Sequence, residues 1–149
     1  MSKQPAIHLS FNVRNLQESV DFYRQFLGVE PTKQKPDFAK FETDAPGLHL
    51  ALNDRGESTD SAAAFRGNLL HLGIRLDSTD EVQTWQERLA ETSLDIREET
   101  NTTCCYARQD KLWAEDPDGN AWEVYTVFED VEKRDARDED CCTKECSCA

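Results

Sequence analysis

Two segments of this chain repeat one pattern and restrict the folds it can adopt. His8-Leu-Ser-Phe-Asn-Val13 and His71-Leu-Gly-Ile-Arg-Leu76 each begin with a histidine and then alternate apolar with polar residues. Alternation with a period of two predicts a strand with one buried face, and in both segments the histidine lies on the polar face. A repeat of this kind predicts two copies of one supersecondary unit.

Each copy continues in the same order. Seven residues after each histidine, Asn15-Leu-Gln-Glu18 and Ser78-Thr-Asp-Glu81 have the spacing of a capping box and predict a helix start. Turn signals later introduce final strands at residues 48–52 and 121–127. Each copy therefore predicts a β-α-β-β-β module, and the whole chain an α+β fold.

The chain divides into a folded part and a tail. Its 149 residues correspond to one domain. We expect this domain at residues 1–128, with modules at about 5–54 and 68–128 and a linker at 54–68. Residues 129–149 are charged, almost free of large apolar side chains and rich in cysteine, which predicts a flexible acidic tail.

Charge and hydropathy exclude several classes of partner. The net charge of −13 argues against nucleic acid and against anionic membrane, since like charges repel. No apolar stretch reaches the roughly 18 residues that span a bilayer. The first ten residues lack the apolar run of a signal peptide. We therefore expect a cytoplasmic protein whose thiols stay reduced.

Three side chains predict a metal site. His8 and His71 occupy equivalent positions on the polar faces of two strands, and Glu123 lies on the polar face of the last strand, between the apolar Trp122 and Val124. Two histidines and one carboxylate leave coordination positions open, as in non-haem Fe(II) oxygen chemistry. The alternative is that all three are ordinary half-buried polar residues.

We do not expect the protein to provide a fourth metal ligand. Aligning Gly47 with Gly119 places Ala51, rather than His49, at the position that corresponds to Glu123. Alanine offers no ligand atom, and we expect His49 to be a bystander.

Six cysteines form two clusters, Cys104–Cys105 and a tail cluster of Cys141, Cys142, Cys146 and Cys148. The first cluster lies in a region where the second module is nine residues longer than the first. Reduced clustered thiols favour soft metals or metalloids. Neighbouring residues in a regular strand face opposite ways, so the pair must lie in a loop or irregular strand to bind one atom. Inert, packed or merely tolerated thiols are the alternative.

The opening HLSFNVRNLQESVDFYRQFLG and the ending WAEDPDGNAWEVY resemble the glyoxalase/bleomycin-resistance/extradiol-dioxygenase (vicinal-oxygen-chelate) superfamily over about residues 5–128. This resemblance implies two βαβββ modules that form a half-open barrel around a metal. It also implies His8, His71 and Glu123 as the ligands of that metal, and by analogy a homodimer.

Within the superfamily, NTTCCYARQDKLW and the cysteine-bearing tail resemble the organoarsenical carbon–arsenic lyases and the related cadmium-inducible proteins. The resemblance implies an Fe(II)- and O2-dependent dioxygenase that cleaves trivalent organoarsenicals, such as methylarsenite or reduced aromatic arsenicals, to arsenite. Cys104 and Cys105 would hold the arsenic. Tyr106 and Lys111 are candidate catalytic residues, against the alternative of a core tyrosine and a surface lysine.

Other functions compete with the lyase. A non-enzymatic protein that binds cadmium or arsenic would use the thiols alone. A glyoxalase-type isomerase or thiol transferase generally needs a fourth ligand, for which Ala51 lacks the side chain. An extradiol dioxygenase shares the metal triad but has no need of Cys104 and Cys105. The tail thiols could capture arsenicals and pass them to the site.

Overall fold

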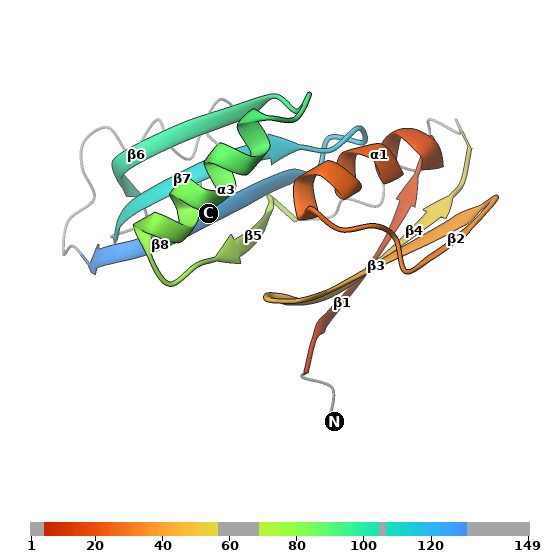
Figure 1. Cartoon of the computed structure of the whole chain (residues 1–149), viewed down its shortest axis with the longest axis horizontal. Coiled ribbons are helices and arrows are strands. Elements are labelled where there is room, and N and C mark those ends of the chain that lie inside the picture. The colour runs from red at the N-terminus through yellow and green to blue at the C-terminus, as the bar shows by residue number, and fades with distance from the viewer. Residues whose placement is uncertain (1–4, 57–68, 105–106, 131–149) are drawn as a thin grey trace. The chain divides into compact units, whose positions relative to one another are not determined.

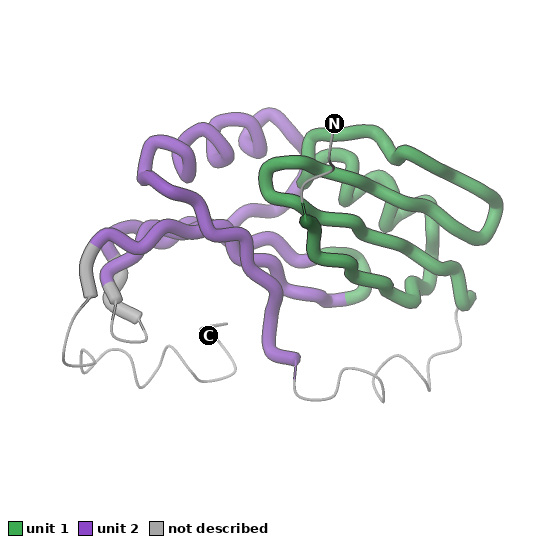
Figure 2. The backbone as a smooth tube through the Cα atoms, turned by 90° about the horizontal axis from the view of Figure 1, so that it is seen from below, with its two compact units in different colours: residues 1–68, 116–118 green, residues 69–115, 119–149 purple. Residues whose placement is uncertain are grey.

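A computed structural model describes residues 5–56, 69–104 and 107–130 (Figure 1). The chain forms two compact units, coloured separately in Figure 2. Unit 1 contains residues 1–68 and 116–118, and unit 2 contains residues 69–115 and 119–149. Each unit holds one four-stranded sheet and, within the described residues, one helix.

Unit 1 follows the predicted order of elements: β1 (Ile7–Val13), α1 (Leu16–Leu27), β2 (Lys33–Lys35), β3 (Phe38–Asp44) and β4 (Gly47–Asp54). Its sheet has the strand order β1-β4-β3-β2. The first and last strands pair in parallel, and the other neighbours are antiparallel.

Unit 2 repeats this topology with β5 (Leu72–Arg75), α3 (Thr79–Ala90), β6 (Ile96–Cys104), β7 (Ala107–Glu115) and β8 (Ala121–Asp130). Its sheet has the order β5-β8-β7-β6, again with a parallel pair of first and last strands. The α+β fold of two βαβββ modules is confirmed, and each sheet is open. β8 continues to Asp130, past the expected start of the tail, because β7 pairs with it to that point.

The helices begin as their sequences predict. The Asn15 side chain accepts a hydrogen bond from the Glu18 backbone N–H, and Ser78 forms a complete capping box with Glu81. α1 ends at Gly28, whose φ of 71° lies in the left-handed region that favours glycine. Within the described residues, no helix is long and apolar enough to cross a membrane.

Each helix covers one face of its own sheet. In unit 1, α1 packs against β3 and β4, and its core includes the fully buried Tyr23, Phe26, Phe41 and Leu50. In unit 2, α3 packs against β7 and β8 and buries Leu89 with Leu112, Trp122 and Val124. The buried residues of each helix therefore form its core face.

The extra length of the second module lies in the β6–β7 hairpin. β6 has nine residues where its counterpart β2 has three. The pairing shifts register between Glu99 and Thr102, and Asn101 in this bulge has a φ of 48°. Asparagine tolerates that conformation, and the Asp110 side chain accepts a hydrogen bond of 2.7 Å from its backbone N–H. Bulges redirect strands and are common beside functional sites.

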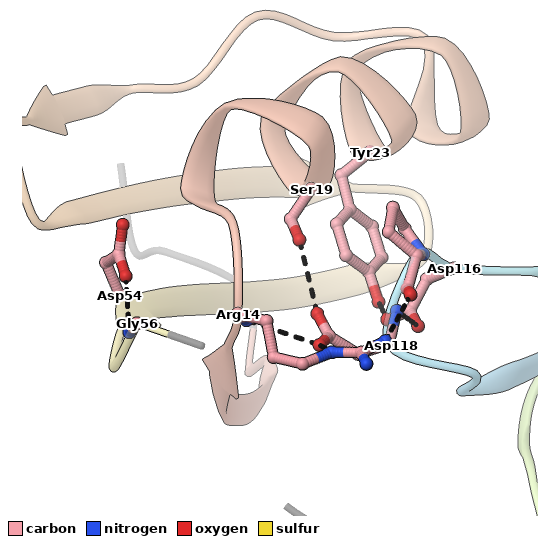
Figure 3. A network of polar contacts seen from close by, with 8 residues as sticks. Arg14, Ser19, Tyr23, Asp54, Gly56, Asp116 and Asp118 are labelled. Carbon is pink, nitrogen blue, oxygen red and sulfur yellow. Dashed lines mark hydrogen bonds and ion pairs between the residues drawn. The ribbon is translucent and has the colours of Figure 1, made fainter. Parts of the chain in front are cut away.

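Residues 116–118, which we call the aspartate turn, connect β7 to β8 but belong to unit 1 (Figure 3). The Tyr23 hydroxyl donates a 2.6 Å hydrogen bond to Asp116 Oδ2. Arg14 donates to Asp118 Oδ1 from Nε at 2.9 Å and from its backbone nitrogen at 3.2 Å, and Ser19 Oγ donates to Asp118 Oδ2 at 3.4 Å. Both carboxylates are buried, so these donors replace the water that each has lost.

We predict that Tyr23→Phe lowers the free energy of unfolding by about 1–2 kcal/mol, because it removes a donor from a buried carboxylate. Urea denaturation monitored by circular dichroism measures this change. Glu30→Gln is the control, since the Arg24–Glu30 pair at 2.8 Å is solvent-exposed and such pairs contribute little. Equal effects of the two substitutions would contradict the stabilising role of the Tyr23–Asp116 hydrogen bond.

Candidate metal centre

Polar side chains gather on the face of the unit 2 sheet opposite α3. In the register, Glu123 of β8 lies between Gly73 of β5 and Trp113 of β7. Lys111, two residues earlier on β7, pairs with Glu99 of β6. Because alternate residues share a face, these side chains project on the same side of the sheet.

His71 and Glu123 form the closest pair of expected ligands. His71 immediately precedes β5, and its Nε2 lies 3.6 Å from Glu123 Oε2. Both side chains are at least 90% buried. Within the described residues, His71 Nδ1 and Glu123 Oε2 have no hydrogen-bond partner. Buried polar atoms without a partner are costly and rare, so this pair is a candidate site for a bound ligand.

Lys111 and Trp113 surround this pair. Lys111 is only 2% exposed, and its Nζ lies 3.9 Å from Glu123 Oε2. The Trp113 ring meets His71 edge to face, with centroids 5.1 Å apart, and Lys111 Nζ lies 5.6 Å from the centroid of the same ring. Lys111 is therefore not a surface lysine, and Trp113 borders the histidine.

Burial controls the ionisation of both expected ligands. Loss of solvent raises the pKa of Glu123 above its ordinary value; nearby Lys111 opposes this rise and Glu99 adds to it. Burial lowers the pKa of His71, and the Lys111 charge lowers it further. The histidine is thus held neutral, which is the form that binds metals.

The pair suits a divalent cation. Imidazole nitrogen and carboxylate oxygen are usual ligands, and two atoms each about 2.1 Å from one tetrahedral metal lie about 3.4 Å apart. The 3.6 Å separation of His71 Nε2 from Glu123 Oε2 is close to that distance. Within the described residues, no third His, Cys, Asp or Glu completes a metal-binding group with them.

His8 lies in unit 1, on β1, where it is exposed. In the pairing of β1 with β4, His8 is directly opposite His49, whose Nε2 lies 3.7 Å from Glu42 Oε1 of β3. The expected bystander is therefore a direct neighbour of His8. Ala51 is opposite Ser10 in the same register.

The expected cysteine site is only partly within the described residues. Cys104 is the last residue of β6, and its backbone is paired with that of Ala107. Cys105 and Tyr106 lie outside the described residues. So do the four tail thiols, Cys141, Cys142, Cys146 and Cys148.

Two charged residues near the pair were not expected from the sequence. Glu99 Oε2 is buried without a partner in the described part of the chain, and Arg97 Nη2 lies 3.4 Å from Glu99 Oε1. Both project from β6, in the lengthened hairpin. Arg97 and Glu99 are two residues apart, and this spacing alone predicts that they share one face of a strand. The sequence does not reveal the strand register that places Glu99 opposite Lys111.

We predict that Glu123→Gln raises the melting temperature of the metal-free protein at neutral pH. A raised pKa means that the folded state holds the Glu123 proton more tightly than the unfolded state. The native carboxylate therefore costs stability as pH rises above its ordinary value of 4.5. Glutamine removes this cost, and the difference should vanish near pH 4, where the carboxyl is protonated in both states.

Differential scanning calorimetry of the chelator-treated protein at both pH values checks this. Glu115→Gln, an exposed position on the same strand as Lys111, is the control and should leave the melting temperature unchanged. A lower melting temperature for Glu123→Gln at neutral pH would contradict the prediction.

Comparisons with known proteins agree with this architecture. The family model of the Glyoxalase/Bleomycin resistance protein/Dioxygenase superfamily matches residues 6–124. A trivalent organoarsenical cleaving enzyme from Bacillus sp. strain MD1 is 45% identical over 140 residues, covering 93% of this chain and 83% of that protein. The cadmium-induced protein CadI from Mycobacterium tuberculosis H37Rv is 38% identical, covering 85% of this chain and 78% of CadI.

Solved structures show the same fold. A glyoxalase/bleomycin resistance protein/dioxygenase from Alicyclobacillus acidocaldarius superimposes with a TM-score of 0.61 at 20% identity, covering 86% of this chain and 95% of that one. The family model spans most of the chain, and the curated relatives extend over nearly all of it. This chain therefore belongs to the glyoxalase/bleomycin resistance protein/dioxygenase superfamily.

Proposed function

We propose that this chain is an Fe(II)- and O2-dependent carbon–arsenic lyase that converts trivalent organoarsenicals to arsenite for detoxification. Its substrates would include methylarsenite and reduced aromatic arsenicals. The other products would be oxidised organic fragments.

The observation that carries this proposal is the 45% identity with a trivalent organoarsenical cleaving enzyme over 93% of the chain. A second relative of that name, from Thermomonospora curvata, is 37% identical over 92% of the chain. The buried His71–Glu123 pair fits the metal that such chemistry needs.

His8, His71 and Glu123 are the residues that we propose hold the iron. When bound, Fe(II) supplies electrons and open coordination positions for the activation of dioxygen. Within unit 2, Lys111 attracts the negative charge of Glu123 and favours the ionised carboxylate that a metal requires. Trp113 and the burial of the pair exclude water from the ligand atoms.

Cys104 and Cys105 are the residues that we propose bind the arsenic. Trivalent arsenic is soft and thiophilic, and an organoarsenical with one carbon substituent has two exchangeable positions. Two neighbouring thiolates fill both and leave only the carbon substituent free. Cys104 closes β6, beside the start of β7, the strand that carries Lys111 and Trp113.

A second candidate is a non-enzymatic cadmium- or arsenic-binding protein. It is favoured by the 38% identity with CadI, a protein named for its induction by cadmium, and by the six cysteines of the chain. A binder would hold the metal or metalloid in stoichiometric amounts and consume no O2.

We predict that anaerobically purified, Fe(II)-loaded protein releases arsenite from methylarsenite only after O2 is admitted. His8→Ala should abolish release by removing a metal ligand, and Cys104→Ser by removing half of the arsenic chelate. Separation of arsenic species over time measures both effects.

His49→Ala is the matched control, because this histidine lies beside His8 in the sheet but is assigned no metal or arsenic atom. It should retain turnover. If methylarsenite instead binds in stoichiometric amounts and is recovered unchanged after denaturation, the binder is correct and the lyase is not.

We also propose that the segment after β8, residues 131–149, captures arsenicals and delivers them to the site. The basis is the four thiols in an acidic segment. Truncation after Val131 should slow turnover at low arsenical concentration and leave it unchanged at saturation, because only capture is lost. Equal rates for the full and truncated chains at low concentration would rule out delivery by the tail.

A further inference from the structure

Four buried side-chain atoms lack a hydrogen-bond partner within the described part of the chain: His71 Nδ1, Glu99 Oε2, Trp113 Nε1 and Glu123 Oε2. They come from β6, β7, β8 and the residue before β5, and all belong to the polar face of the unit 2 sheet. Unpaired buried atoms are normally few and scattered. Their concentration on one sheet face marks it as a binding surface.

A metal held by His71 Nε2 and Glu123 Oε2 accounts for only one atom of this set, Glu123 Oε2. Trp113 Nε1 is a hydrogen-bond donor, so it cannot bind a cation. Glu99 forms no metal-binding group with the other two residues. One donor and one acceptor therefore need a second, polar ligand beside the metal pair.

These two atoms flank Lys111. Glu99 pairs with Lys111 across the β6–β7 ladder, and Lys111 Nζ lies 5.6 Å from the centre of the Trp113 ring. Trp113 is 5% exposed and the Glu99 side chain 17%, so water competes weakly for either atom. Arg97 approaches the other carboxylate oxygen of Glu99, which leaves Oε2 for the ligand.

A hydroxyl group is the complement of this pair, because it accepts one hydrogen bond and donates another. We propose that Trp113 and Glu99 form a subsite that binds a hydroxyl group brought by the substrate. The Trp113 indole N–H donates to the hydroxyl oxygen, and Glu99 Oε2 accepts the hydroxyl proton. The identity of the substrate as an organoarsenical rests on the proposed function.

Two sources of this hydroxyl are distinguishable. A ring hydroxyl is present in 4-hydroxyphenylarsenite and absent from phenylarsenite. A water molecule carried with the substrate is common to both compounds, because the two cysteine thiolates displace the hydroxyl groups on arsenic. The same pair of probes therefore tests the subsite and identifies its ligand.

Nuclear magnetic resonance observes the donor directly. The chain has three tryptophans, Trp85, Trp113 and Trp122, so the full-length protein labelled with 15N-tryptophan gives three indole N–H signals. Zn(II) serves as a diamagnetic substitute for iron, and Trp113→Phe assigns the signal. Arsenical binding should move the Trp113 proton downfield, while Trp85 and Trp122 stay in place as internal controls.

A shift with 4-hydroxyphenylarsenite alone assigns the subsite to the ring hydroxyl, and a shift with both compounds assigns it to the common water molecule. An unmoved Trp113 signal in protein that has bound either arsenical overturns the subsite. If wild-type Fe(II) protein forms no arsenite while Trp113 still shifts, the proposed lyase fails and the subsite stands.

Substitution tests the acceptor independently of Trp113. Glu99→Gln should weaken binding of the arsenical that shifts Trp113 by about fivefold to tenfold, because a neutral amide oxygen replaces a charged acceptor. Zn(II) should still bind with the same stoichiometry, since Glu99 is not one of the proposed metal ligands. Glu98→Gln is the matched control, because Glu98 is exposed and lies on the opposite face of β6. Equal affinities of the two variants would overturn the role of Glu99.

Discussion

The parallel pairing of the first and last strands organises both units. Parallel neighbours cannot be joined by a tight turn, so the chain crosses over through a helix that covers one face of each sheet. α1 packs on β3 and β4 in unit 1, and α3 packs on β7 and β8 in unit 2. The opposite face is then left for polar side chains, and strand alternation places His8 in one unit and Glu123 in the other on such a face.

The polar face of the unit 2 sheet lowers the stability of the fold, because it buries charged and polar groups. It buries a lysine, a histidine and two carboxylate groups, and several of their atoms have no partner among the described residues. Core residues of the same size would stabilise the fold more. A sheet that retains Glu123 at 3% exposure, with burial raising its pKa, is organised for a ligand rather than for stability.

The two modules differ most in the hairpin that follows the helix. β2 and β3 form a short hairpin, whereas β6 and β7 are long and are interrupted by a bulge at Asn101. Glu99, Lys111 and Trp113 all come from the long hairpin, and Cys104 closes its first strand. Glu99 and Lys111 correspond in the pairing to Lys35 and Phe38 of the short hairpin, so the extra length is the segment 100–110, which contains Cys104. This insertion leaves the order of strands in the sheet unchanged.

The sequence by itself determined the α+β fold, the two modules, the helix caps at Asn15 and Ser78 and the face on which Glu123 lies. These features depend on residues that are neighbours along the chain, so periodicity and capping residues reveal them. Only the tertiary structure brought His71 within 3.6 Å of Glu123, buried Lys111 and placed Glu99 beside it. It also assigned the aspartate turn to unit 1. These features depend on strand register and packing between distant segments, which local sequence does not specify.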